Sequence, residues 1–405
     1  MRLGDEVFDH LDWCISYKKP CIFVTDLRRI PFQTYITLSK FYKSKKCDPK
    51  IVIVGQNLFI ADYGNNINFF LKIYRIIYLI VIHEASINFK LNSRNYESLE
   101  VGIRSSAVSL TRNENINKNQ NQQLFEGLEK LALNANFCSI WALHNLKYDV
   151  AFVFNGRLAS SLPIRLNSEI QGIPIGYIEY GFEGLARVYP FSPHFNKSYP
   201  ALIDKYWETC KIDHSKKIAI SLHYMKLKMT NRFTRFYIHE DDSERFEFTF
   251  FVNSNDEYVS ILQGGGDEKL KLVDQIKILD ELYNAFPKSS LCVRCHPNMR
   301  FADRSFEKEL KLKCDALGIS FISSDDNTNS YSLIARSKYV VVGTSSIALD
   351  ATLLGAKVIV AGDAKYKTML GIQWNDFLEN KNFDFDIVRL HKFCFFSANY
   401  GMNVK

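Results

Sequence analysis

The sequence predicts an α/β protein built from two Rossmann-like, doubly wound domains that face a cleft. In both halves of the chain, apolar runs of strand length alternate with amphipathic segments of helix length. The run 149–154, the helical segment 159–171 and the run 173–178 form a strand–helix–strand unit, which implies parallel strands. At 405 residues the chain is long enough for two domains of ordinary size.

The predicted elements follow one another in a regular order along both halves. The strands expected in the first half are Pro20–Asp26, Lys50–Gly55, Asp149–Phe154 and Ile173–Ile178. Those expected in the second half are Glu247–Asn253, Ser290–Cys295, Ile319–Ser323, Tyr339–Gly343 and Lys357–Ala361. Helices are expected between them at Asp267–Phe286, Phe306–Leu317, Asn329–Ser337 and Ser345–Leu354.

Between the halves, Ser221–Arg245 is polar and basic, and we interpret it as the linker region. We therefore expect an N-terminal Rossmann-like domain at 1–235 and a C-terminal Rossmann-like domain at 236–385. A C-terminal segment follows at 386–405.

Composition excludes some classes of protein and leaves others open. Lys and Arg number 51 against 44 Asp and Glu, a modest basic excess that suits an anionic ligand, an anionic membrane surface or an ordinary basic protein. No Arg-rich tract or nucleic-acid module is present, so nucleic-acid binding is not expected. The opening Met1–Asp12 is charged and lacks the apolar core of a signal peptide. The apolar stretch Phe69–Ile82 is shorter than the ~20 residues that a membrane-spanning helix needs.

Nine cysteines, an odd number without framework spacing, are typical of reduced thiols in the cytoplasm. Cys292 and Cys295 form a C-x-x-C inside a predicted strand, without the second pair that a zinc site needs. We therefore expect no metal and no cofactor.

The sharpest motif is Thr344-Ser345-Ser346, which joins a buried strand to a helix. Small hydroxyls and backbone N–H groups at the start of a helix suit an anion, although Ser345 or Ser346 can equally be a plain N-cap. Asp350, one turn further on, is placed either to meet a ribose hydroxyl or to complement the helix dipole.

Two more motifs follow strands of the second half. Arg294, His296 and Pro297 lie where a strand ends, and Arg with His suits a phosphate or a carboxylate. Ser254 and Glu257 also follow a strand, where they either form a capping box or border the cleft. Open α/β sheets bind ligands at this carboxyl edge, so these residues are predicted to border a site for an anionic ligand.

The first half has corresponding motifs at two strand ends. Asn155-Gly156-Arg157 follows one strand, and we expect it to line the acceptor side of the cleft. Glu179, with Glu183 as second choice, lies at the end of the next strand. A carboxylate there can take the proton from an acceptor hydroxyl, or can be an ordinary surface carboxylate of a turn.

Taken in order, these motifs resemble those of the capsule-polysaccharide-biosynthesis glycosyltransferases, which are related to the Kdo transferases of capsule assembly. The match runs from Ala151 to Tyr366 and includes Asn155–Arg157, Glu179–Gly181, Ser254–Glu257, Arg294–Asn298 and Thr344–Ser346. The acidic-x-Gly, His-Pro and Ser-Ser pattern is also similar to that of bacterial sialyltransferases.

The resemblance implies a GT-B-like, cytoplasmic, inverting and metal-independent transferase. A nucleotide sugar, with a CMP-sugar such as CMP-Kdo as a plausible case, would be its donor. The motifs that follow strands of the second half would bind this donor, so 236–385 would be the donor domain and 1–235 the acceptor domain. A polysaccharide or glycolipid would be its acceptor, with peripheral contact with the inner membrane. Asp350 stands where the family tends to have Glu. The ends of the chain resemble internal stretches of the family, so we expect a truncated chain.

Three other functions remain open from the sequence. A nucleotide-sugar epimerase of the same architecture would need two or more carboxylates in the cleft and no acceptor. A non-catalytic sugar-nucleotide or polysaccharide binding paralogue would bind without turnover. A glycerophosphate transferase would have a similar fold and a similar anion site.

Overall fold

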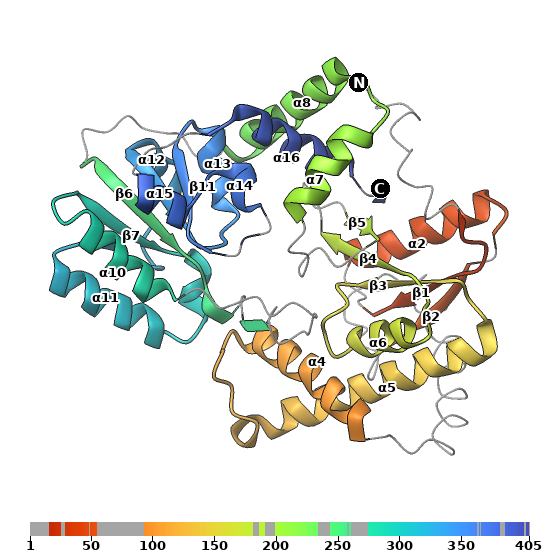
Figure 1. Cartoon of the computed structure of the whole chain (residues 1–405). Coiled ribbons are helices and arrows are strands. Elements are labelled where there is room, and N and C mark those ends of the chain that lie inside the picture. The colour runs from red at the N-terminus through yellow and green to blue at the C-terminus, as the bar shows by residue number, and fades with distance from the viewer. Residues whose placement is uncertain are drawn as a thin grey trace.

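The computed structural model describes residues 16–25, 29–47, 49–54, 93–180, 186–190, 199–233, 244–256, 259–260, 274–362, 364, 366–380, 385–400 and 402–404. Two six-stranded sheets, each with helices packed on both faces, form its two halves (Figure 1). The predicted α/β class with two Rossmann-like sheets is therefore confirmed. The expected domain boundary at 235/236 and the apolar stretch 69–82 lie outside the described residues.

The first sheet has the strand order β12-β5-β4-β3-β1-β2. Its core strands β2, β1, β3 and β4 are parallel, whereas β5 runs antiparallel to β4 and β12 antiparallel to β5. The elements of this half are β1 Pro20–Val24, α2 Arg29–Ser44, β2 Lys50–Ile53, α4 Ser93–Thr111, α5 Gln122–Leu146, β3 Val150–Phe154, α6 Leu162–Ile170, β4 Ile175–Tyr180 and β5 Ala186–Tyr189.

The second sheet is parallel throughout and has the order β11-β10-β9-β6-β7-β8. Numbered within this half, that is the 3-2-1-4-5-6 order of dinucleotide-binding folds, with the reversal between β6 and β9. Its elements are β6 Phe246–Val252, α10 Gln275–Ala285, β7 Leu291–Cys295, α11 Ser305–Leu317, β8 Ser320–Ile322, α12 Ser330–Ala335, β9 Ser337–Val342, α13 Ile347–Leu353, β10 Lys357–Val360, α14 Lys367–Leu370, β11 Ile372–Gln373 and α15 Trp374–Asn380.

Three further helices pack on one face of the second sheet. They are α7 Tyr199–Thr209, α8 His214–Phe233 and α16 Ile387–Asn399, and they share one apolar core with α13 and α14. Figure 1 shows α8 and α16 side by side above this sheet. After α16 the chain returns to the first sheet as β12, Met402–Val404.

The predicted linker at Ser221–Arg245 is wrong over its first part, because α8 continues to Phe233. Tyr224 and Met225 are buried in the core that α8 shares with α16, whereas exposed positions of α8 are basic. The buried and exposed residues of this segment alternate with the period of a helix. Polar and basic composition with few strand signals led to the interpretation of this segment as the linker region between domains, although its first part is a Lys-rich helix with a narrow apolar stripe. Among the described residues, no helix has both the length and the apolar character needed to cross a bilayer.

Candidate functional site

The carboxyl ends of three strands meet at one edge of the second sheet. β6 pairs in parallel with β9 on one side and with β7 on the other, so Thr344, Asn253 and His296 follow neighbouring strands at the same edge. The expected convergence of the Thr-Ser-Ser turn and the His-Pro turn at one edge is therefore observed. The reversal between β6 and β9 is the position at which open α/β sheets leave a crevice for a ligand.

Asn253, which the sequence reasoning did not single out, joins the two strands at this reversal. Its side-chain amide donates a hydrogen bond to Thr344 Oγ1. Its backbone N–H donates to Gln275 Oε1 at 2.7 Å, and Gln275 Nε2 donates to Asn255 Oδ1 at 2.8 Å. A polar residue directly after a buried strand was the available signal. The first residue of α10 thus fixes the segment that follows β6.

The Thr-Ser-Ser turn is held by Tyr366, the N-cap residue of α14. The hydroxyl of Tyr366, which is buried, donates to the carbonyl oxygen of Ser345 at 2.5 Å. Ser345 Oγ accepts from the N–H of Ile347 at 3.4 Å, while Ser346 is exposed and makes no side-chain capping bond. Asp350 is 1% exposed, in the core-facing part of α13. The hydroxyl of Ser346 is therefore the one that this turn presents to solvent.

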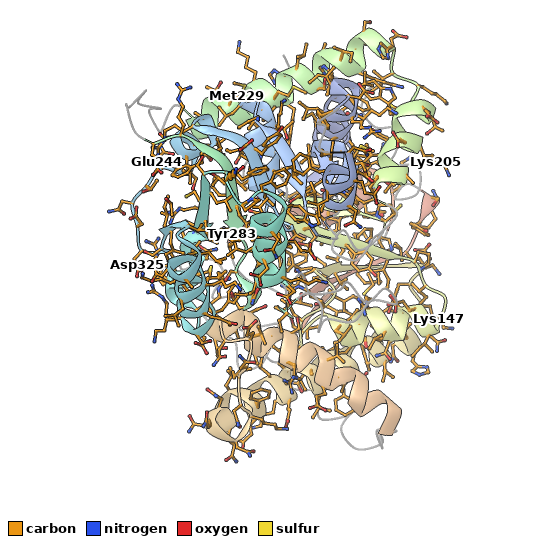
Figure 2. All side chains as sticks on the ribbon, turned by 60° about the vertical axis from the view of Figure 1, so that its left-hand side comes forward. Lys147, Lys205, Met229, Glu244, Tyr283 and Asp325 are labelled. Atoms are coloured by element: carbon orange, nitrogen blue, oxygen red, sulfur yellow. The ribbon has the colours of Figure 1, made fainter. Side chains whose placement is uncertain are left out.

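Arg294 is 3% exposed, and its guanidinium group fastens the loop after β8. It donates to the carbonyl oxygen of Ser323 and, at 3.1 Å, to that of Asp326. Burial lowers the pKa of Arg294 from its usual value, and the nearby Asp326 carboxylate opposes that shift. Figure 2 labels Asp325 in this loop, at the outer edge of the second half. Arg294 therefore shapes the carboxyl edge beside β7.

His296 begins the 3-10 turn Pro297–Phe301 as its N-cap. Its Nδ1 accepts a hydrogen bond from the backbone N–H of Asn298 at 3.1 Å, which places the proton of the neutral ring on Nε2. Pro297 at the first position of the turn has no N–H and needs no acceptor. This geometry accounts for the His-Pro pair after β7 and leaves the ring with an Nε2–H donor.

The C-x-x-C cysteines do not form a site. Cys292 and Cys295 belong to different apolar clusters, one on each face of the second sheet, since residues three apart on a strand point in opposite directions. Burial raises the pKa of Cys292 to about 12 and that of Cys295 further, so both are protonated thiols. Within the described part of the chain, no three His, Cys, Asp or Glu side chains are grouped so that they could hold a metal ion.

At the edge of the first sheet, Asn155 and Gly156 form a left-handed turn. Their φ angles are 64° and 79°, a backbone that Asn and Gly tolerate better than other residues. A Cβ on Gly156 would lie 2.7 Å from Cε1 of Tyr177, so the turn also approaches β4 closely. The N–H of Asn155 donates to the carbonyl of Ile178 at 3.0 Å.

Glu179 lies beside this turn, one residue before the end of β4. It is 7% exposed and is paired in register with Arg187 of β5. The structure therefore brings Asn155, Gly156 and Glu179 together at one edge, as expected. Glu183 and Glu257 lie outside the described residues.

Arg157 connects the edges of the two sheets. Its Nη1 donates to Ser105 Oγ of α4 at 2.8 Å and to the carbonyl of Ser260 at 3.1 Å. Ser260 follows β6, and Arg157 follows β3. The carboxyl edges of both sheets are thus joined through one guanidinium group.

A second link joins the end of α4 to the same segment. Arg112 Nη1 lies 3.3 Å from Asp256 Oδ2, and Asp256 in turn accepts a hydrogen bond from the hydroxyl of Ser254. Of the two roles expected for Ser254 and Glu257, a capping box or a border of the cleft, neither is tested, because Glu257 lies outside the described residues. Burial, together with Asp256 and Asp303, raises the pKa of Glu114 above its usual range. Sequence reasoning missed Arg112 and Glu114, which no local motif marks.

Comparison with known proteins identifies one family. Residues 203–389 match the family of the capsule polysaccharide biosynthesis protein. A search of curated proteins finds no significant match. The matched segment starts in α7 and ends in α16, so it coincides with the second sheet and the helices that share its core.

Solved structures show distant likenesses only. The beta Kdo 2,4 transferase of Thermosulfurimonas dismutans KpsC is 14% identical with a TM-score of 0.43, over 62% of this chain and 79% of that one. The beta Kdo 2,7 transferase of the same protein is 14% identical with a TM-score of 0.40, over 62% of this chain and 75% of that one. A UDP-GlcNAc 2-epimerase from Neisseria meningitidis, bound to UDP-GlcNAc, is 13% identical with a TM-score of 0.32, over 95% of each chain.

At these scores no functional property passes from those proteins to this chain. The family match agrees with the resemblance carried by the motifs of the second sheet. Over residues 203–389, this chain is similar to the capsule polysaccharide biosynthesis family.

Proposed function

We propose that this chain is a glycosyltransferase that moves a sugar from a nucleotide donor onto a polysaccharide or glycolipid acceptor during synthesis of a bacterial surface polysaccharide. The observation that carries the proposal is the Asn253–Thr344 bridge at the strand reversal of the second sheet. This position binds nucleotides in sheets of that order, and it lies inside the segment that matches the capsule family.

The second-sheet edge supplies groups suited to a phosphate. The Nε2–H of His296 and the hydroxyls of Thr344, Ser345 and Ser346 are hydrogen-bond donors, and preorganised donors stabilise negative charge that develops on a leaving phosphate. Arg294 holds the neighbouring loop in place. The proposed donor is a CMP-sugar such as CMP-Kdo, whose leaving group is CMP.

Glu179 is the proposed catalytic base at the first-sheet edge. Its carboxylate takes the proton from an acceptor hydroxyl as that oxygen attacks the anomeric carbon of the donor sugar. The bond between the anomeric carbon and the phosphate oxygen breaks, and the electron pair leaves with the nucleotide phosphate. One displacement inverts the anomeric configuration. Asn155 and Gly156 form the acceptor-side wall beside Glu179, with Glu183 as a second carboxylate for this role.

A thermal-shift screen with CMP-, UDP-, GDP- and TDP-sugars tests the donor. A ligand at 100 times its Kd adds about 2.7 kcal/mol to the folded state, and we expect this shift with CMP-sugars. Added EDTA should leave both binding and transfer unchanged, in keeping with a metal-independent reaction. Absence of a shift with all four donor classes would contradict the assignment.

Substitution of His296 tests the phosphate contact. His296→Ala should abolish transfer while the far-ultraviolet circular dichroism and the melting temperature stay close to wild type. His144→Ala, at an exposed position near the end of α5, is the matched control and should retain full turnover. Full turnover of His296→Ala would sink the donor-site assignment.

Incubation with donor alone separates transfer from epimerisation. A transferase leaves the donor intact or hydrolyses it slowly, whereas an epimerase changes the sugar without an acceptor. Donor binding without turnover, with any acceptor, would indicate a non-catalytic paralogue.

A peripheral membrane location is part of the proposal. α8 carries no carboxylate along its length, and its exposed face presents Lys216 and Lys226 with Leu222 and Met229. Basic and apolar side chains together bind anionic lipid surfaces. The chain should float with vesicles that contain phosphatidylglycerol but not with neutral vesicles. The double variant Lys216→Glu/Lys226→Glu should lose this binding, and retained flotation would exclude α8 as the contact.

A further inference from the structure

We propose that Arg157 is a positioning residue that joins the two halves of the molecule at a fixed pivot. The pivot consists of Ser105 and Ser109 of α4, Ser260 after β6, and the Arg157 guanidinium group between them. This inference rests on the proposed function only where turnover is concerned. The pivot itself is a statement about contacts.

The two segments at the pivot are joined in both directions. Ser105 Oγ donates to the carbonyl of Ser260 at 2.7 Å, and Ser260 Oγ donates to the carbonyl of Ser105 at 2.9 Å. Ser109 Oγ also meets Ser260 Oγ. A reciprocal pair of this kind fixes the position of one backbone against the other, because a slide by one residue would break both bonds.

Two serines of the pivot are buried, whereas Ser109 and Arg157 are half-buried. Ser105 is 0% exposed and Ser260 is 1% exposed. Buried polar groups that lose a partner destabilise a structure by about 1–3 kcal/mol each. Arg157 supplies the charged donor at this point, since its Nη1 contacts Ser105, Ser109 and both oxygens of Ser260.

α4 also contacts the first half directly beside the pivot, through Ser106 and Gly102. The N–H of Ala159 donates to Ser106 Oγ at 2.8 Å. Gly102 lies so close to α6 that a Cβ there would approach Leu162 Cδ2 to 3.0 Å. α4 therefore moves with the β3–α6 turn, and a contact between α4 and Ser260 is a contact between the two halves.

Arg157 follows the left-handed turn at Asn155 and Gly156 directly. The turn that shapes the edge beside Glu179 thus also places the guanidinium group that holds the segment after β6. On the proposed function, donor and acceptor must meet between these two edges. A displacement of about 1 Å between reacting groups lowers turnover by about 100-fold.

A cysteine pair tests the geometry directly. Ser105 Oγ and Ser260 Oγ lie 3.5 Å apart, so Ser105→Cys/Ser260→Cys should form a disulfide on mild oxidation, detected by mass spectrometry of peptides. Wild type under the same oxidant is the control. Absence of the cross-link in the folded variant would overturn the pivot. If the pivot is fixed, the oxidised variant has the same turnover as the reduced one. Turnover lost on oxidation and restored by reduction would show that the halves must separate there.

Substitution of Arg157 tests its role. Arg157→Met should increase hydrogen–deuterium exchange in 253–260 at least 10-fold and lower kcat at least 10-fold with the donor KM unchanged. Lysine is shorter than arginine by one atom along the side chain, so Arg157→Lys should recover part of the protection against exchange and part of kcat. Arg104→Met, an exposed arginine of α4, is the matched control and should change neither.

Unchanged exchange in Arg157→Met would overturn the inference. A raised donor KM with unchanged exchange would instead make Arg157 a ligand contact. A wild type that turns over no donor would count against the proposed function, while the exchange and cross-linking results would still decide on the pivot.

Discussion

Gly156 shows how a single residue sets the geometry of a strand end. Its φ of 79° and the 2.7 Å approach of a virtual Cβ to Tyr177 are two separate constraints. Gly156→Ala should therefore lower the free energy of unfolding by about 2–4 kcal/mol, from left-handed strain together with the clash. Gly172 has a φ of 64°, and a Cβ there would meet no atom within 4 Å. Gly172→Ala should therefore lower the free energy of unfolding by only about 1 kcal/mol. Equal losses in urea denaturation would show that the approach to Tyr177 is unimportant.

Glu114 carries a pH dependence at the junction between the halves. Burial, Asp256 and Asp303 raise its pKa above 4.5, whereas Asn255 opposes the shift by a hydrogen bond. A carboxyl with a raised folded-state pKa stabilises the fold below its ordinary pKa, and this stability is lost as the pH rises through the raised pKa. Glu114→Gln should therefore have a higher Tm than wild type at pH 7 and no advantage at pH 4. A Tm difference that does not vary with pH would contradict this coupling.

At the scale of elements, the sequence predicts the central buried strands better than it predicts the helix α8 and the short strands β5 and β12. Val340–Val342 and Val358–Val360 are continuous apolar runs with turn residues after them, and both are buried strands of the sheet. α8 was missed because its apolar stripe is narrow and its exposed face is basic. β5 and β12 were missed because strands of four and three residues are too short to show an alternation of apolar and polar residues. Their pairing depends on contacts distant in sequence.

Tyr366 shows how one element holds the functional turn of another. Its buried hydroxyl donates to Ser345 at the end of β9, so Tyr366→Phe should cost about 1–2 kcal/mol in stability and weaken donor binding. Tyr283→Phe on α10 (labelled in Figure 2) is the control, since its half-buried hydroxyl makes no hydrogen bond within the described residues. Calorimetry of donor binding distinguishes the two variants. Unchanged affinity in Tyr366→Phe would mean that the turn keeps its shape without this bond.

At the scale of the whole molecule, strand–helix alternation predicted two parallel sheets but not how they are joined. The convergence of three strand ends follows from parallel topology alone, which is why Thr344 and His296 were assigned to one edge correctly. The contacts of Arg157 with Ser105 and Ser260 could not be predicted, since 52 and 103 residues separate the partners and no motif marks the serines. The return of the chain to the first sheet as β12 was likewise beyond sequence patterns.

Tyr400 tests whether the returning segment couples the two halves. Its ring stacks on that of Phe396, with 4.3 Å between the ring centroids, and meets the Tyr206 ring edge-on at a centroid distance of 5.0 Å. It also stacks on Tyr189 of β5, with 6.4 Å between the centroids. Phe396 and Tyr206 belong to the core between the second sheet and the helices α7, α8 and α16, whereas β5 belongs to the first sheet. Removal of such a ring costs about 3–5 kcal/mol when it is fully buried and less when it is partly exposed.

We therefore expect Tyr400→Ala to split unfolding into two transitions, because the halves then lose the aromatic contact that spans them. Tyr400→Phe keeps the rings and should melt as wild type does, since the hydroxyl adds little to the stacking. Differential scanning calorimetry distinguishes one peak from two, and hydrogen–deuterium exchange in β4 and β9 assigns each peak to a sheet. One sharp peak in Tyr400→Ala would show that the other contacts between the halves, at Arg157, at Arg112 and through β12, couple them without this ring.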